Sequence, residues 1–157
     1  MSKFKTEYGY FTEDGKEYVI TRPDTPRPWI NVMSNGDYSV IISQTGGGYS
    51  FWKNSSLARI TRWLQDLIQD EWGKYIFLRD RDSKDAWSLS WKPMCPKFDL
   101  YEVRYGMGYS TIASKLNGIR SSVTIFVPPE EPLEVWKVSI RNEDSKDRRL
   151  SVFSYLE

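Results

Sequence analysis

The sequence contains no histidine and only one cysteine among its 157 residues. The missing histidine excludes Ser-His-Asp triads, Cys-His dyads and metal sites built on imidazole. With Cys95 alone, the chain can form neither an internal disulfide nor a zinc site of three or four cysteines. This composition favours a reducing compartment. Any chemistry within the chain would rest on carboxylates, lysine, tyrosine or arginine.

An excess of one charge is also missing, since 22 Lys and Arg residues stand against 21 Asp and Glu residues, for a formal net charge of +1. A nearly neutral chain has no electrostatic reason to bind nucleic acid or an anionic membrane. No window approaches eighteen apolar residues, and residues 1–7 lack the apolar core of a secretory signal. We therefore expect a cytoplasmic protein with no nucleic-acid or membrane partner.

Aromatic residues are abundant, at 15% of the chain, with seven Trp and ten Tyr. Tyr8 to Ile20 predicts a hairpin around the turn Glu13 to Lys16, because β-type residues flank a segment in which φ can become positive. Further strands are predicted at residues 38–43, 49–52, 74–79, 87–91, 100–105, 109–113, 119–127, 135–141 and 150–156. Strands at such short intervals predict an all-β fold, an antiparallel β-sandwich in one domain.

One segment departs from the strand pattern. Between Ile60 and Asp70, apolar residues recur at spacings of three and four, which is typical of a short amphipathic helix. The alternatives of helix and loop stay open for this segment, so the fold is expected to hold at most one short helix.

The strand predicted from Leu150 to Leu156 runs into the end of the sequence without a turn or a polar tail. Domains usually end in polar, frayed segments. We therefore expect residues 1–157 to be a single sandwich domain that is incomplete at its C-terminus and belongs to a larger polypeptide. The alternative is an edge strand that happens to be terminal.

The most unusual local sequence is the glycine run Gly46 to Gly48, followed by Tyr49 and Ser50. Three glycines permit a close approach by another group. One hypothesis is a loop tip against a sugar, a phosphate or a neighbouring subunit, with Gly47 and Gly48 in contact, an aromatic face from Tyr49 and a hydroxyl from Ser50. The alternative is an ordinary hairpin turn with a bulge, which the local pattern slightly favours.

Other candidate residues are more ambiguous. Paired acids such as Asp70 with Glu71, or Asp80 with Asp82, are interpreted as solvated turn charges, because sequence neighbours do not flank a substrate bond. Several arginines lie beside aromatic or glycine-rich segments, where a guanidinium can hold a phosphate or a carboxylate. Trp87, Trp91 and Trp136 are predicted core residues, whereas Trp29, Trp52 and Trp72 lie near loops and are candidates for exposed contacts.

An ordered set of motifs resembles the beginning of glycoside hydrolase family 94 enzymes, which include cellobiose, cellodextrin and chitobiose phosphorylases. The resemblance covers nearly the whole chain. Its segments are Tyr18 to Asn31, Gly46 to Ser50, Arg59 to Arg62, Tyr75 to Asp80, Trp87 to Pro93, Tyr101 to Arg104, Phe126 to Pro128 and Ser151 to Glu157.

This resemblance implies an N-terminal supersandwich domain of the galactose mutarotase-like type, followed in complete enzymes by an (α/α)6 barrel that carries the catalytic acid. Family enzymes invert configuration with inorganic phosphate as co-substrate and without a cofactor. The resemblance therefore implies no catalytic residue and no metal in this chain. It further implies a β-linked oligosaccharide substrate, a homodimer and a sandwich that approaches the cleft. One departure is Tyr105, where many relatives carry histidine.

By resemblance, the candidate substrate-binding or cleft-facing residues are Gly47, Gly48, Tyr49, Ser50, Arg59, Arg62 and Arg104. Three functional hypotheses follow. The chain is a catalytically silent N-terminal domain or fragment of an inverting glycoside phosphorylase, a stand-alone carbohydrate-binding module, or an assembly module that dimerises or pairs through an open strand edge.

Overall fold

The computed structural model describes residues 4–64, 66 and 68–157. Within these residues the chain forms twelve β-strands in three antiparallel sheets and no helix. The predicted all-β, antiparallel architecture is therefore confirmed. Within the same described ranges, no helix is long and apolar enough to cross a membrane, and no three acidic or thiol side chains are grouped so that they could hold a metal ion.

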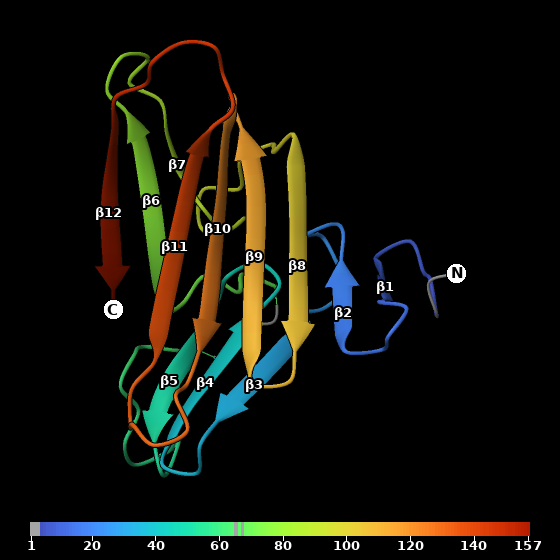
Figure 1. Ribbon diagram of the computed structural model, residues 1–157. Helices are drawn as coiled ribbons and strands as arrows, with labels where there is room; N and C mark the ends of the chain where they lie inside the picture. Colours follow the sequence, from blue (N-terminus) through green and yellow to red (C-terminus); the bar gives the residue numbers. More distant parts are fainter. Residues whose placement is uncertain (1–3, 65, 67) are drawn as a thin grey trace.

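The largest sheet has six strands and forms one layer of the molecule (Figure 1). In spatial order its strands are β1 (Gly9–Phe11), β2 (Glu17–Ile20), β8 (Leu100–Gly106), β9 (Tyr109–Leu116), β10 (Ile119–Phe126) and β11 (Val135–Asn142).

Two smaller sheets pack against this layer around one core. In Figure 1, β3 to β5 lie at the lower ends of β8 to β11, and β6 and β12 lie to the left of β11. One contains β12 (Leu150–Leu156), β6 (Lys74–Asp80) and β7 (Ala86–Ser88), in that order. The other contains β3 (Ile30–Ser34), β4 (Tyr38–Ser43) and β5 (Gly48–Trp52), in that order.

The period-two pattern of the sequence produces the core. In β10, Ile119, Ser121, Val123 and Ile125 are buried, while the residues between them are more exposed. Val123 lies directly opposite Ile112 of β9, so one face of the large sheet is apolar. The two small sheets complete the same cluster with Met33, Val40, Ile42, Leu78, Trp87 and Leu89.

The predicted role of the tryptophans agrees in part with their burial. Trp87 is buried in the core, and Trp136 packs against it from β11. Trp52 is 47% exposed, as its position near a loop predicted. Trp29 differs from the prediction, because it packs against the core cluster and contacts Tyr8 and Tyr18 edge-on or at a tilt.

One strand was not predicted. β3 carries Ile30 and Val32 on a face that is more than half exposed, at 55% and 54%, so its apolar residues do not mark the core. Its inward residues are Asn31 and Met33. The Asn31 amide donates to the carbonyls of Gly106 and Tyr109, and this polar contact ties β3 to the large sheet.

The segment between Ile60 and Asp70 is not helical in its described residues, while Gln65 and Leu67 lie outside them. Arg59 instead forms a bridge with Phe51, and the Ile60 amide donates to the Ser50 carbonyl at 2.8 Å. These contacts extend the chain beside β5. The exposure of Ile60 and Ile68 shows that the apolar spacing does not form one buried stripe.

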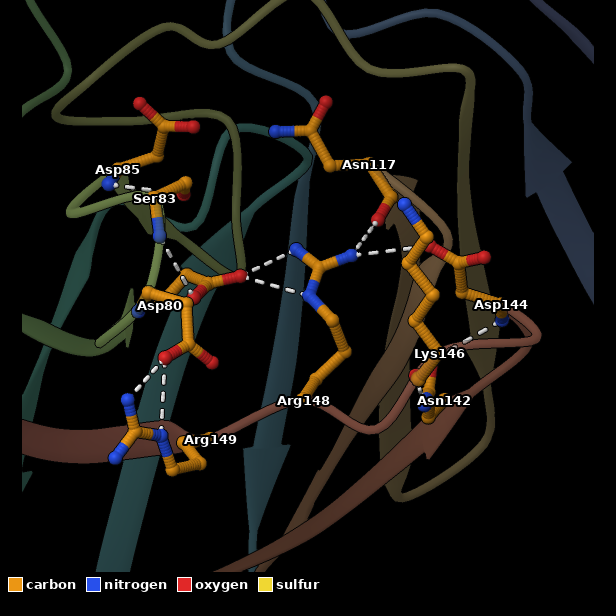
Figure 2. A network of polar contacts seen from close by, with 10 residues as sticks. Asp80, Ser83, Asp85, Asn117, Asn142, Asp144, Lys146, Arg148 and Arg149 are labelled. Carbon is orange, nitrogen blue, oxygen red and sulfur yellow. Dashed lines mark hydrogen bonds and ion pairs between the residues drawn. The ribbon is translucent and has the colours of Figure 1, made fainter.

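A polar network fixes the start of β12 against the turn after β6 (Figure 2). The buried Asp80 carboxylate accepts hydrogen bonds from Arg148 Nε and from the backbone amide of Asp82, both at 2.8 Å. Arg148 also donates to the Asn117 carbonyl at 2.9 Å. The Arg148 side chain, followed by these turn contacts, lowers the pKa of Asp80. The ion pair therefore joins β6 to the segment that enters β12.

Candidate functional site

A cavity of about 280 Å³ lies where the turn between β4 and β5 meets the segment before β6. Its walls combine apolar side chains with hydroxyl and carboxyl groups. They are formed by Pro28, Ile30, Ile41, Ser43, Gly47, Gly48, Tyr49, Trp63, Asp66 and Asp70. Three of the residues singled out by sequence, Gly47, Gly48 and Tyr49, therefore line one cavity.

The glycine run forms the hairpin turn that the sequence left as one alternative. The Ser43 amide donates to the Gly47 carbonyl at 2.7 Å, and the Gly46 amide returns to the Ser43 carbonyl at 3.0 Å. A Cβ on Gly47 would lie 2.4 Å from the Asp70 carbonyl oxygen, which is too close for any side chain. The close approach is thus made by the chain itself, and it brings Asp70 to the cavity.

Asp70 is one of the two carboxyl groups that line this cavity. Its Oδ2 accepts hydrogen bonds from Ser43 Oγ at 2.5 Å and Thr45 Oγ1 at 2.6 Å. Burial raises the pKa of Asp70, and these two hydroxyl groups oppose the rise in part. The sequence interpretation of Asp70 as a solvated turn charge is wrong, because the turn after β4 folds over it.

The second carboxyl group of the cavity belongs to Asp66. Its Oδ1 accepts the backbone amides of Ile68 and Gln69, both at 2.9 Å. Because those amides stabilise the charged form, the pKa of Asp66 is lowered. Asp66 therefore organises the turn that carries Asp70 into place.

An aromatic wall closes another side of the cavity. The rings of Tyr49 and Trp63 stack with centroids 4.8 Å apart, and the Arg59 guanidinium lies 5.5 Å from the Tyr49 ring and 5.6 Å from the Trp63 ring. Arg59 Nη1 donates to the Trp63 carbonyl at 3.1 Å. Among the described residues, no carboxylate forms an ion pair with Arg59, so no acid neutralises its charge beside these two rings.

Ser50 points to a different cluster. It is fully buried, and its Oγ donates a hydrogen bond to Glu134 Oε1 at 3.0 Å. The same Oγ accepts a hydrogen bond from Lys74 Nζ. Tyr38 OH and Trp136 Nε1 donate to the same carboxylate at 3.1 and 3.0 Å. Ser50 thus contributes to a buried contact between the sheets, while its neighbour Tyr49 lines the cavity.

The two remaining arginines are engaged by carboxylates. Arg62 lies 4.5 Å above the Trp72 ring and pairs with Glu157, on the β12 side of the site. Arg104 lies in the large sheet, where its Nη1 and Nε contact Glu17 and Glu102 at 2.8 and 2.7 Å. The structure therefore places Arg59 beside two aromatic rings that line the cavity, and Arg104 among acids of its own sheet.

The arrangement is suited to binding a small polar ring. Ligand sites combine mostly apolar walls with a few placed polar groups, and this cavity offers aromatic rings, a hydroxyl and the Asp70 carboxyl. The sequence analysis did not select Ser43, Trp63 or Asp70. Trp63 was hidden in the helix-like spacing, and the partners of Asp70 lie 25 and 27 positions away.

Comparison with known proteins gives one family. The family described as "Glycosyl hydrolase 94, supersandwich domain" matches residues 16–157. The chain is 43% identical over 153 residues to N,N'-diacetylchitobiose phosphorylase of Vibrio furnissii, covering 96% of this chain and 19% of that protein.

Two proteins of Paenibacillus borealis are also similar. Solabiose phosphorylase is 31% identical, over 96% of this chain and 20% of its own length. 3-O-beta-D-glucopyranosyl-beta-D-glucuronide phosphorylase is 35% identical, over 94% of this chain and 18% of its own length. The chain thus spans about a fifth of the length of these curated relatives. Because the match extends over nearly all of its strands, the chain belongs to the supersandwich domain family of glycosyl hydrolase 94.

Proposed function

We propose that this chain is the non-catalytic supersandwich domain of an inverting glycoside phosphorylase that acts on β-linked oligosaccharides. The observation that carries the proposal is the family match over residues 16–157, together with similarity to proteins named as phosphorylases. The chain's own residues agree with a silent domain, because they include no histidine and form two sheet layers around a packed core.

The cavity beside the turn between β4 and β5 is the part of this domain that would meet the sugar. The Asp70 carboxyl group can accept a hydrogen bond from a sugar hydroxyl, while the Tyr49 and Trp63 rings can pack against the apolar face of the sugar. Arg59, beside these two rings, can attract inorganic phosphate or an acidic sugar. The chemistry itself requires an (α/α)6 barrel in the same or a separate polypeptide, and the complete protein is proposed to act as a cytoplasmic homodimer.

The experiment that tests this role is complementation in trans. The chain alone, incubated with N,N'-diacetylchitobiose or cellobiose and phosphate, should release no sugar 1-phosphate above the blank. Mixed with the Vibrio furnissii phosphorylase from which the matching domain has been deleted, it should restore phosphorolysis. The deleted domain, supplied separately, is the positive control. Restoration by that control but not by this chain would contradict the proposal, as would turnover by the chain alone.

A second candidate function, favoured by the cavity itself, is oligosaccharide binding by the isolated chain. Calorimetric titration with β-linked disaccharides should then give heat that Trp63→Ala abolishes. Trp52→Ala is the matched control, because Trp52 is exposed and does not line the cavity. A titration without heat would mean that sugar contact requires the barrel.

A further inference from the structure

The dipeptide Asn-Gly occurs twice in the chain, at Asn35 and at Asn117. Both copies lie in turns that join paired antiparallel strands, the first between β3 and β4 and the second between β9 and β10. An asparagine before glycine is prone to cyclise, because glycine has no Cβ to keep its backbone nitrogen away from the preceding side chain. The surroundings of each copy decide whether it can react.

Hydrogen bonds hold both ends of the Asn35 side-chain amide. Its Nδ2 donates to the backbone carbonyls of Pro128 and Glu131 at 2.8 and 2.9 Å. Its Oδ1 accepts hydrogen bonds from the backbone amides of Asp37 and Tyr38 at 3.1 and 2.9 Å. The side chain therefore cannot turn toward its own backbone without breaking these contacts.

The nitrogen that would attack Asn35 is held as well. The Gly36 backbone amide donates a hydrogen bond to Ser34 Oγ at 3.1 Å. Ser34 Oγ in turn lies 2.8 Å from Ser39 Oγ, a contact that fixes its position beside the turn. Both reacting groups of the first Asn-Gly pair are thus engaged by other partners.

The second copy lacks these restraints. Leu116 pairs with Ile119, so Asn117 and Gly118 form a two-residue hairpin loop, with φ angles of 50° and 76° that are typical of a type I′ turn. Asn117 is exposed. Among residues 4–64, 66 and 68–157, neither its side-chain amide nor the Gly118 N–H group makes a hydrogen bond. Figure 2 shows the side-chain amide pointing away from Arg148, whose guanidinium bonds to the backbone carbonyl of Asn117 instead.

We propose that Asn117 is a site of spontaneous deamidation and that Asn35 is protected from the same reaction. The Gly118 backbone nitrogen gives its proton to a base in solution and attacks Asn117 Cγ. A bond forms between this nitrogen and Cγ, the bond from Cγ to Nδ2 breaks, and Nδ2 takes up a proton and leaves as ammonia. Water then opens the succinimide ring, at Cγ to give aspartate or at the former backbone carbonyl carbon to give isoaspartate. Water is the co-reactant, and nothing is oxidised or reduced.

Deamidation at this position changes a turn that carries part of the network in Figure 2. In isoaspartate the backbone runs through Cβ and Cγ, which lengthens a two-residue loop whose geometry matches the pairing of β9 with β10. The carbonyl that accepts Arg148 Nη1 at 2.9 Å also becomes part of a free carboxylate. The reaction at Asn117 therefore alters both the turn and its contact with Arg148.

Peptide mapping of the aged protein tests the contrast within one sample. The chain is incubated under mildly alkaline conditions, either folded or unfolded in guanidinium chloride, and is then digested and analysed by mass spectrometry. In the folded chain, Asn117 should convert from amide to acid at least about tenfold faster than Asn35, because several hydrogen bonds must open at Asn35 first. In the unfolded chain the two rates should become similar. Similar rates in the folded chain, or the same difference in the unfolded chain, would overturn the proposal.

Two serine variants test the protection of Asn35. Ser34→Ala removes the acceptor of the Gly36 amide and should raise the rate at Asn35 several-fold in the folded chain. Ser39→Ala is the matched control, since it removes the contact with Ser34 Oγ but leaves that acceptor in place. Both variants should leave the rate at Asn117 unchanged. Equal acceleration of Asn35 by the two variants, or by neither, would contradict the protection by this hydrogen bond.

Ammonia release by the folded chain gives a third measurement. Asn117→Gln should remove most of the ammonia released, because the longer glutamine side chain forms the cyclic intermediate much more slowly. Undiminished release from this variant would refute the assignment of the site to Asn117. The reaction needs neither sugar nor barrel, so its outcome is independent of the proposed function.

Discussion

At the scale of single residues, the chain shows how burial gives one carboxyl group a special property. Asp70 and Asp66 line the same cavity, yet their pKa values move in opposite directions. Asp70 is desolvated under the turn after β4, whereas Asp66 is held by two backbone amides. The environment of each group therefore decides its protonation, and the residue type does not.

The raised pKa of Asp70 makes a prediction for stability against pH. Because the folded state holds this proton more tightly than the unfolded state does, Asp70 becomes destabilising as pH rises above its unfolded pKa of about 3.9. The penalty is complete above the folded pKa. Asp70→Asn keeps an acceptor for Ser43 and Thr45 but removes the charge.

Asp70→Asn should therefore raise the free energy of unfolding at pH 7 relative to wild type, and have a smaller effect at pH 3.5. Urea denaturation at both pH values measures the difference. Asp66→Asn is the control and should show the opposite sign at pH 7, because its lowered pKa makes the charged form stabilising in the folded state. An equal effect of Asp70→Asn at both pH values would contradict the assignment.

At the scale of the element, the turn between β4 and β5 shows why a glycine is needed where no ligand is bound. Gly46 has φ of +95°, and a Cβ there would lie 2.4 Å from the Ser90 Cβ. Gly47 meets the Asp70 carbonyl. The run therefore lets two segments of one chain pack together, and the cavity is a consequence of that packing.

Gly47→Ala should destabilise the chain by about 1–3 kcal/mol, as expected for overpacking against a backbone atom. It should also displace Asp70 and weaken any sugar binding. Gly36→Ala is the control, because Gly36 also lies in a hairpin turn and a Cβ there would meet nothing within 4 Å. Gly36→Ala should lower the free energy of unfolding by only about 1–2 kcal/mol, because alanine is strained at a positive φ, and it should leave the cavity intact. Thermal denaturation and calorimetric titration measure the two effects.

At the scale of the whole molecule, one buried ion pair links the layers. Lys74 of β6 forms an ion pair with Glu134, which precedes β11. The Glu134 carboxylate also accepts hydrogen bonds from the hydroxyl groups of Tyr38 in β4 and Ser50 in β5. The two charged side chains are only 11% and 12% exposed. Burial lowers the pKa of Lys74, against the opposing effect of Glu134. The cluster thus joins all three sheets at one point.

Lys74→Met should destabilise the chain by about 3–5 kcal/mol, because it leaves the Glu134 charge buried without its partner. The double variant Lys74→Met, Glu134→Leu should recover a large part of that loss, since an apolar pair replaces the ion pair. Urea denaturation of the single and double variants gives the coupling energy. A loss of unfolding free energy below about 1 kcal/mol for Lys74→Met would show that the pair behaves as a solvent-exposed ion pair and adds little to stability.

Local pattern was enough to predict the strands that alternate cleanly, such as β10 and β11, because side chains two positions apart must share a face of a strand. The sequence also determined the exclusion of histidine chemistry. Local pattern did not predict β3, whose apolar residues face outward, and it left open whether the described residues between Ile60 and Asp70, which are not helical, form a helix. The half-buried position of Asp70 beneath Ser43 and Thr45 comes from the folded chain alone, because those contacts join residues that local pattern cannot relate.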